Sequence, residues 1–450
     1  MEPRDQYFLA DAHGSLGKYD RALKLAADMP QTERELRGRV LKRVVERQPE
    51  PGVVRVHQQV GAGLDLSRPV VEVVGAGAAG RGDVAADVVV GPRVTDAALV
   101  VGPAAWWHGW ALDDWDRLAG AVVAGHIVEC GTQATGGNYT WFNEIPDLTK
   151  PLGFPIAEVA ADGSSVITKH EGTGGLVNVG TVTAQLLYEI GTTDYANPDV
   201  VTRIDTIALP QPAPDRVRVD GARGLPAPPM AKVCINLDGG YRNRMSFVLT
   251  GLDQQRKAQW LTDALFRRVG GKDRFDEVDV RFVEAPSDAP TQEQASGRLH
   301  VTVKSRDERL AGKAFSGAAI ELALANYPGF FATGGPSEAQ SYGVYWPALV
   351  AATDVQEVVV LPDGTRQPVP RPGVGGTHDG LAPTQFEPTP SAPSIVAAGP
   401  QPGEPLGAHF AARSGDKGGN ANVGIWARDA AGYAWLHEHL TAAAVQRLLP

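Results

Sequence analysis

The chain has 450 residues, too many for one ordinary hydrophobic core, so we expect two or three domains. Its 43% hydrophobic and 21% charged residues are typical of a globular protein, and its net charge of −10, without a stripe of Lys and Arg, argues against a nucleic-acid partner. No apolar run reaches the roughly 18 residues of a membrane helix, so we expect no membrane partner. Two cysteines exclude a disulfide framework and a four-cysteine zinc site, and they fit a reducing cytoplasm, where we place the protein.

The first 100 residues predict one helix followed by short strands. Residues 1–48 have the periodicity of a polar helix, which Pro49 and Pro51 end. Apolar runs then predict three strands, the last of them buried and followed by a turn at 91–99; the runs lie at 53–56, 70–74 and 84–91.

A helix capped by Asp113 or Asp114 is predicted next, and it runs to about Cys130 with Gly131 as its stop. A glycine-rich loop follows it directly. The remaining predicted elements of this part are a strand, a glycine-rich turn and a helix, at 164–170, 170–175 and 178–191.

After residue 200 the pattern changes to alternating strands and amphipathic helices. We expect two strands on either side of a turn at Gly239 and Gly240, and a final helix that Pro328 stops. Between them the pattern predicts a helix and two strands, at 253–271, 276–284 and 297–307. This order is typical of an α+β domain with an antiparallel sheet.

The last part of the chain predicts a hairpin at 357–370, a linker and a small folded segment. Residues 362–405 hold eleven of the 34 prolines, which is typical of an extended linker. The predicted fold class is α/β and α+β: an N-terminal α/β domain, a middle α+β domain with an antiparallel sheet, and a small C-terminal α/β segment ending in a helix from about Tyr433. The expected segments are 1–83, 84–200, 201–361, 362–404 and 405–450.

One group of candidate site residues lies at the end of the helix that precedes the first glycine-rich loop. His126, Glu129 and Cys130 share a helix face, and a helix C-terminus disfavours a thiolate, so Glu129 or His126 is the better acid or base. The alternative is that His126 is a hydrogen-bonded core residue and Glu129 caps a neighbour. The loop adds three binding candidates, Thr132, Gln133 and Asn138. His, Glu and Cys at this spacing do not match a zinc site, so we expect no metal.

A second group is the sequence HEGTGG, between a strand and a helix. Its glycines can aim backbone N–H groups at a carboxylate, phosphate or oxyanion, and the helix N-terminus adds positive charge. His170 is a further acid or base, and the binding candidates are Thr173, Gly174 and Gly175. A purely structural turn is the alternative.

Two further groups combine arginine with carboxylates. Arg93 can hold a carboxylate by a two-point contact with Asp96 orienting it, or the two can simply brace their turn. Charges and glycines packed into one late turn suggest a loop that contacts an anion or docks on another domain; its candidates are Arg413, Asp416, Lys417 and Asn420.

Three motifs are considered and set aside. A literal GxGxxG at 75–80 leaves no room for a crossover helix before the next strand, which argues against a dinucleotide. The chain has no GxxxxGK[ST] loop and no GxSxG elbow, which argues against a P-loop and a serine-hydrolase site.

Long phrases of the chain resemble the acyclic terpene utilisation protein A family. The phrases are GPRVTDAALVVGP (91–103), the stretch from GWALDDW to ATGGN (109–138), HEGTGGLVNVGTVTAQLLYEIG (170–191), NYPGFFATGGP and YGVYWPALV (326–350), and ARSGDKGGNANVGIWARD (412–429). The resemblance implies a branched acyl-CoA or carboxylic acid as substrate, with CoA entering as part of the substrate and no resident cofactor. We expect an enzyme of lyase, hydratase or thioester hydrolase type, in which HEGTGG holds the carbonyl or carboxylate, Glu129 and His126 move protons, and Arg93 or Arg413 binds the acid group.

Compared with members of that family, the N-terminal region (residues 1–83) and the C-terminal domain are short. This keeps two alternatives open: a non-catalytic or half-site subunit of a split complex, and a biosynthetic enzyme of specialised metabolism. We therefore expect a homo-oligomer, or a partner chain that supplies the missing segments.

Overall fold

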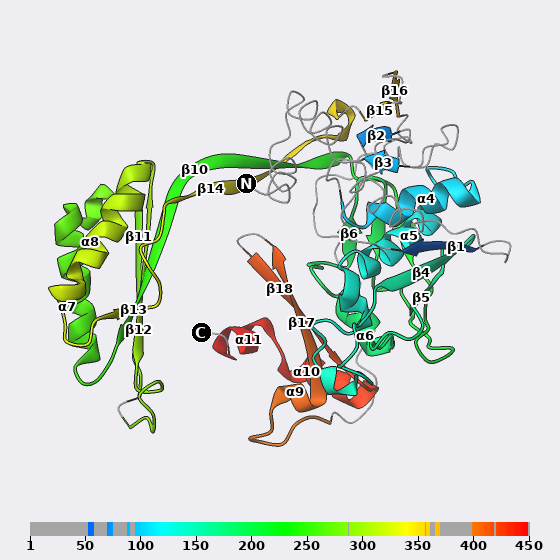
Figure 1. Cartoon of the computed structure of the whole chain (residues 1–450). Coiled ribbons are helices and arrows are strands. Elements are labelled where there is room, and N and C mark those ends of the chain that lie inside the picture. The colour runs from blue at the N-terminus through cyan, green and yellow to red at the C-terminus, as the bar shows by residue number, and fades with distance from the viewer. Residues whose placement is uncertain are drawn as a thin grey trace. The chain divides into compact units, whose positions relative to one another are not determined.

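The computed structural model describes most of the chain and divides it into two compact units. The described residues are 53–57, 70–74, 88–90, 95–286, 288–355, 357–360, 365–369, 398–417 and 420–448. The first unit comprises Met1–Ala231 with Val350–Pro450, and the second comprises Lys232–Leu349. Helices combined with antiparallel sheets confirm the predicted α/β and α+β class (Figure 1). In the described part of the chain, no helix has both the length and the apolar character needed to span a membrane.

The first unit is built around one buried helix, α5 (Trp115–Val128). Every residue from Leu118 to Val128 is buried, as expected of a helix that is apolar all round and covered on all sides. Helix α4 (Ala98–His108), helix α6 (Val179–Leu186) and strands of two sheets contact it. One antiparallel sheet has the strand order β1 (Val53–His57), β4 (Pro155–Ala160), β5 (Ser165–Lys169) and β8 (Val217–Val219). The other sheet consists of β6 (Asp194–Ala196), β7 (Val201–Arg203) and β9 (Arg223–Leu225). Two 3₁₀ turns, Gly131–Thr135 and Phe142–Glu144, lie between α5 and β4.

Two glycines let α5 lie close to its neighbours. A Cβ at Gly120 would lie 2.0 Å from the carbonyl oxygen of Gly163, and one at Gly125 would lie 2.1 Å from the carbonyl oxygen of Ala97. Both contacts are with backbone, so neither neighbour can move aside cheaply. Small residues on α5 therefore set how deeply this helix sits.

Several predicted elements of the first unit are confirmed, and one helix was missed. The strands predicted at 53–56, 70–74 and 84–91 are β1, β2 (Val70–Val74) and β3 (Val88–Val90). Strands β2 and β3 are parallel neighbours in a sheet with β15 (Val358–Val360) and β16 (Arg366–Pro368), which form the predicted hairpin. Helix α4 begins where only a turn was predicted, because its continuously apolar sequence, with Pro103 inside, has no helical period. The helix predicted over 1–48 lies outside the described residues.

The second unit is a five-stranded antiparallel sheet with helices on one face (Figure 1). Its strands are β10 (Met230–Leu249), β11 (Glu277–Val283), β12 (Gly297–Ser305), β13 (Phe331–Ala332) and β14 (Gln340–Ala351). Helices α7 (Gln254–Val269) and α8 (Phe315–Glu321) bury their apolar side chains against the sheet. Short helical turns lie at Lys272–Arg274, Leu310–Ala314 and Leu322–Leu324. A further turn, Ala352–Asp354, belongs to the first unit.

Two predictions for the second unit are wrong. The turn predicted at Gly239 and Gly240 does not form, since β10 continues through both residues. Gly240 has φ +81°, which a strand tolerates as a local kink, so the pair bends the strand without reversing it. The helix predicted up to Pro328 is interrupted: α8 ends at Glu321 and a 3₁₀ turn at Leu322–Leu324 follows.

The C-terminal segment is a hairpin followed by two helices. Strands β17 (Phe410–Lys417) and β18 (Asn420–Ala427) pair antiparallel. The prediction that Arg413, Asp416 and Lys417 share one turn is therefore wrong, because all three lie in β17. A short helix, α9 (Leu406–His409), precedes the hairpin, and the predicted final helix is split into α10 (Ala430–His439) and α11 (Ala442–Leu448).

Candidate functional site

The C-terminal end of α5 brings an acid and a thiol together. Glu129 caps the helix, and the thiol of Cys130 donates a hydrogen bond of 2.9 Å to its Oε1. Gly131 has φ +62°, which allows the chain to turn directly after this pair. Burial, together with the hydrogen bond to Glu129 and its negative charge, raises the pKa of Cys130 to about 12. The thiol is therefore protonated at neutral pH, as the sequence predicted for a cysteine at a helix C-terminus.

Helix α6 and the residues just after it contribute two further residues to this site, Gln185 and Glu189. Gln185 is almost fully buried and donates to the carbonyl oxygen of His126 at 3.4 Å, and its amide group opposes the rise in the pKa of Cys130. Glu189 follows the helix with φ +60°, and its charge also raises the pKa of Cys130. Sequence analysis missed both residues, although the helix predicted over 178–191 would place Gln185 and Glu189 on one face at a four-residue spacing.

The β17–β18 hairpin closes the site with a cation. Arg413 on β17 donates from Nη2 to Oε1 of Gln133, 280 positions earlier in the chain. Its guanidinium also stacks over the ring of Tyr188, 4.2 Å from the ring centroid. Burial raises the pKa of Tyr188 first, the charge of Glu189 raises it further, and the charge of Arg413 lowers it. We call Glu129, Cys130, Gln133, Gln185, Glu189 and Arg413 the α5–α6 corner.

Docking of the hairpin on α6 fixes the position of Arg413. The side-chain amide of Asn422 donates to the carbonyl oxygens of Leu187, at 3.1 Å, and Ile190, at 2.8 Å. A Cβ at Gly415 would lie 2.7 Å from the backbone nitrogen of Glu189, so only glycine permits this approach. The hairpin therefore packs directly against the residues that follow α6.

His126 and Asp96 both lie near Tyr195. The His126 ring is buried and lies 5.3 Å from the Tyr195 ring, centroid to centroid. Burial raises the pKa of Tyr195, and the charges of Glu129, Asp96 and Glu189 add to the effect. Structure thus places two of the predicted acid–base candidates, Glu129 and His126, within one neighbourhood, with exposed Asp96 near its edge.

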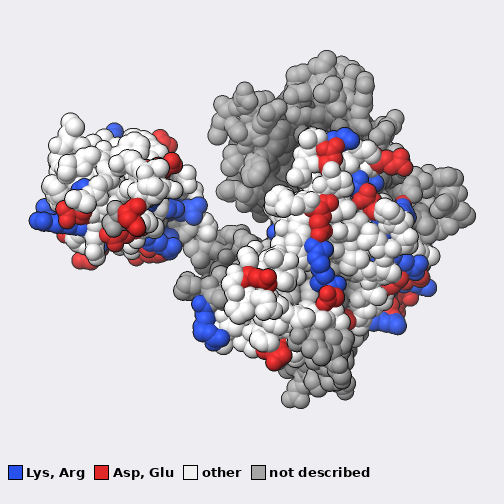
Figure 2. Space-filling view, turned by 90° about the horizontal axis from the view of Figure 1, so that it is seen from below, with Lys and Arg blue, Asp and Glu red and all other residues white. Residues whose placement is uncertain are grey.

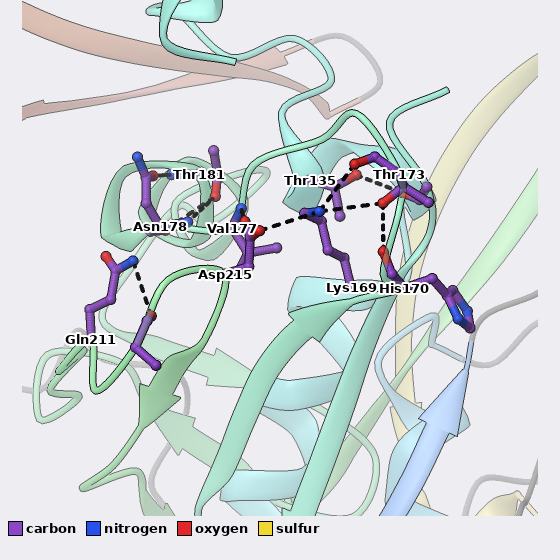
Figure 3. A network of polar contacts seen from close by, with 11 residues as sticks. Thr135, Lys169, His170, Thr173, Val177, Asn178, Thr181, Gln211 and Asp215 are labelled. Atoms are coloured by element: carbon purple, nitrogen blue, oxygen red, sulfur yellow. Dashed lines mark hydrogen bonds and ion pairs between the residues drawn. The ribbon is translucent and has the colours of Figure 1, made fainter. Parts of the chain in front are cut away.

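The HEGTGG loop forms a separate network at the N-terminal end of α6 (Figure 3). The N–H groups of Gly174 and Gly175 donate to the carbonyl oxygens of Pro151 and Leu152, at 2.9 and 3.2 Å. In this conformation those two amides are occupied by backbone acceptors. The hydroxyl of Thr173 donates to the carbonyl oxygen of its loop neighbour His170, at 2.8 Å.

A lysine and an aspartate that sequence analysis did not single out hold this loop in place. The side chain of Lys169 is 8% exposed, and its Nζ lies 3.3 Å from Oδ2 of Asp215 and 3.3 Å from the carbonyl oxygen of Thr173. Asp215 also accepts a 2.8 Å hydrogen bond from the N–H of Val177, just before the helix. These contacts attach the loop to the start of α6 (Figure 3). The corner residues Gln185 and Glu189 instead lie at the end of this helix and just after it. His170 itself is exposed.

The remaining candidates take varied positions. Asn138 is exposed and has φ +58°. The carbonyl oxygen of Thr132 accepts hydrogen bonds from the N–H of Gly137 and the hydroxyl of Thr135, and these two hydrogen bonds stabilise the loop. Arg93 lies outside the described residues. For three candidates the structure gives only a place on the hairpin strands; they are Asp416, Lys417 and Asn420. Among the described side chains, no group of three His, Cys, Asp or Glu residues could hold a metal ion.

Comparison with known proteins identifies the family. A model of the acyclic terpene utilisation family protein AtuA matches residues 79–361. Because the match covers more than half of the 450 residues, the chain belongs to the acyclic terpene utilisation family. No curated protein and no solved structure matches the chain. Five of the six corner residues lie inside the matched range and Arg413 lies beyond it.

Proposed function

We propose that the chain is an enzyme of branched acyl-CoA or carboxylic-acid metabolism, of lyase or hydratase type, and that the α5–α6 corner performs its proton transfer. The observation that carries the proposal is the position of Arg413, which a hairpin brings to Gln133, in the turn that directly follows the helix capped by Glu129. A cation next to a base can stabilise the negative charge that develops when a proton leaves the carbon next to a carbonyl.

Glu129, Arg413, Gln133 and the neighbouring Tyr188 have proposed roles. Glu129 removes the proton from the carbon adjacent to the carbonyl and becomes the carboxylic acid. The electron pair of the broken C–H bond moves onto the carbonyl oxygen, and Arg413 holds that oxygen or an acid group beside it. In a dehydration the electron pair then returns from the oxygen to form a C=C bond as the C–O bond of a hydroxyl group on the next carbon breaks, and Glu129 gives its proton to that hydroxyl, which leaves as water. The reverse sequence completes a hydration. Gln133 and Tyr188 hold the guanidinium in a fixed orientation.

The state of Cys130 favours proton transfer over thioester cleavage by a cysteine nucleophile. Attack on a thioester needs a thiolate, whereas the pKa of Cys130 is raised to about 12. As a hydrogen-bond donor to Glu129, the thiol instead orients the carboxylate that we assign as the base. A hydrolase in which Glu129 activates water is the weaker form of the proposal.

Exchange of substrate protons with solvent tests the proposed step without knowledge of the complete reaction. The protein is incubated in D₂O with a panel of branched-chain acyl-CoA thioesters and free acids, and deuterium on the carbon next to the carbonyl is measured by mass spectrometry. We expect Glu129→Gln to slow exchange at least about 100-fold, since general acid–base catalysis contributes factors of that order. We expect Arg413→Gln to weaken substrate binding and slow exchange.

Two exposed residues provide matched controls. Glu171→Gln in the HEGTGG loop and Arg447→Gln on α11 make the same chemical changes away from the corner, and both should exchange as the parent protein does. Exchange that Glu129→Gln leaves unchanged would contradict the assigned base. A parent protein that exchanges none of the thioesters or acids would favour the alternative of a non-catalytic subunit.

A further inference from the structure

The sheet of the second unit has one covered face and one open face. Met245, Phe247 and Leu249 of β10 are buried in the core with α7 and α8. Because successive side chains of a strand point to opposite faces, Arg244 and Ser246 lie on the face without helices. Figure 1 shows both helices on one face of this sheet.

The register of three strands gathers cations around one histidine on the open face. Ser246 of β10 lies opposite His300 of β12, and His300 lies opposite Arg281 of β11. Ser246 Oγ and His300 Nδ1 are 2.7 Å apart, a hydrogen bond across the two strands. Arg244 and Arg298 lie one step away on the same face, each two residues from Ser246 or His300 in its own strand.

The charges of these cations act on the pKa of His300. Burial lowers it first, and the charges of Arg244, Arg298 and Arg281 each lower it further. The imidazole is therefore neutral at pH 7 and can serve as a hydrogen-bond donor or acceptor beside three guanidinium groups.

The cations of this face are only partly neutralised by neighbouring side chains. Arg281 pairs with Asp279 at 3.0 Å, and the next cation along the sheet, Lys304, pairs with Glu277 at 2.6 Å. Arg298 donates to the carbonyl oxygen of Ser296 at 2.9 Å and has no carboxylate partner among the residues that the structure describes. Arg244 is exposed, and within the described residues its side chain has no ion pair and no hydrogen bond.

We propose that Arg244, Ser246, Arg281, Arg298 and His300, the arginine–histidine face, bind the phosphate group of a phosphomonoester. A phosphate carries about two negative charges near pH 7 and three terminal oxygens, so it can engage several guanidinium groups, whereas a carboxylate saturates one. Ser246 and His300 add neutral hydrogen-bonding groups at the centre of the cluster. The site lies in the second unit and does not depend on the function proposed for the corner.

The surroundings favour a small ligand over a nucleic acid. Glu277 and Asp279 border the cluster on β11, so the positive area does not extend along the sheet. Figure 2 shows Lys and Arg interspersed with Asp and Glu on the faces of both units in view. A nucleic acid needs a continuous basic surface, while a single phosphate group needs only one cluster.

Calorimetric titration of the full chain at low ionic strength tests the proposal. The ligands are inorganic phosphate, CoA and dephospho-CoA, which lacks the 3′-phosphate. We expect saturable phosphate binding that the double variant Arg244→Gln/Arg298→Gln weakens at least ten-fold and that His300→Gln weakens less. Arg256→Gln, which removes an exposed arginine from α7, should bind as the parent protein does.

The three ligands separate the possible sources of the phosphate. Tighter binding of CoA than of dephospho-CoA, lost in the double variant, would support the site and assign it to the 3′-phosphate of CoA. Equal binding of the two, with phosphate itself still bound through the arginines, would support the site and assign it to another phosphomonoester. Absence of saturable phosphate binding, or equal binding by the parent and the double variant, would overturn the proposal.

Discussion

Cys130 and Glu129 are adjacent in the chain and are joined by a 2.9 Å hydrogen bond in which the sulfur is the donor. Neighbouring side chains on a helix usually diverge, so this contact depends on the place where α5 ends and the chain turns at Gly131. Its chemical result is a thiol that keeps its proton and a carboxylate with a fixed orientation.

Alkylation kinetics should report the protonated thiol. In a Cys234→Ser background, Cys130 should react with iodoacetamide far more slowly than an ordinary thiol near neutral pH, and its rate should rise as pH approaches its pKa of about 12. Glu129→Gln should speed the reaction, because it removes the charge that favours the protonated form. A Cys130 that alkylates as fast as a free thiol would contradict this account. The control is Glu171→Gln.

The same pKa gives a direction for stability at alkaline pH. The pKa is raised from 9.0 to about 12 in the folded chain, so the unfolded chain loses the proton first as pH rises. The contribution of the thiol to stability is therefore complete below pH 9.0 and is lost between pH 9.0 and about 12. In urea titrations at rising pH above neutrality, Cys130→Ala should lose less stability than the parent chain.

Docking of the hairpin can be disturbed by one methyl group. Gly415→Ala would place a Cβ 2.7 Å from Glu189 and 2.6 Å from Oδ1 of Asn422, so the hairpin must shift. We expect faster hydrogen exchange in β17 and β18 and a loss of about 1–3 kcal/mol, the usual cost of overpacking. Gly407→Ala, where a Cβ meets nothing within 4 Å, is the control. Unchanged exchange in Gly415→Ala would show that the hairpin is not docked as described.

The space around each glycine predicts opposite effects for two glycine-to-alanine changes, one in the closely packed helix α5 and one in α8. Gly125→Ala would place a Cβ 2.1 Å from the backbone oxygen of Ala97, and we expect it to destabilise the first unit by about 2 kcal/mol or more. Gly317→Ala lies in α8 with open space around it, so it should stabilise the second unit by roughly 0.5–1 kcal/mol. Hydrogen exchange measured peptide by peptide separates the two units. Equal effects at the two glycines would be inconsistent with this packing.

Asp215 combines a charge with a hydrogen bond, and two variants separate these contributions. Asp215→Ala loses the contacts to Val177 and Lys169 and has φ +54°, which alanine tolerates poorly, so we expect a cost of about 2–3 kcal/mol. Asp215→Asn keeps the acceptor and tolerates this φ, and it should cost about 1 kcal/mol less. Urea unfolding measures both variants. If asparagine costs as much as alanine, the charge of Lys169 dominates.

Local patterns were enough to predict most strands and helices, but not how long each continues. Strand β10 runs through Gly239 and Gly240, although two adjacent glycines usually indicate a turn. Whether such a pair reverses or kinks a strand depends on its partner, and Tyr241 pairs with Ser305 directly after it. That partner is more than 60 residues away and leaves no trace in the local sequence.

The candidate site shows the same division between local and distant information. The spacing of His126, Glu129 and Cys130 predicted one helix face, and the structure places them at one helix end. The contact between Arg413 and Gln133 could not be predicted, because it depends on where the β17–β18 hairpin docks on the rest of the first unit. The pairing of Lys169 with Asp215 was likewise invisible, since Asp215 sits in an irregular segment without a recognisable motif.

Assembly of the corner also has an order in time. A ribosome adds roughly 5–20 residues per second, so the codon for Arg413 is read some tens of seconds after that for Gln133, 280 positions earlier. During that interval α5 and α6 can already pack together, while Gln133 and Tyr188 do not yet contact Arg413. The corner is therefore complete only in a molecule whose synthesis has passed the hairpin, and a prematurely terminated chain would carry the carboxylate of Glu129 without its arginine.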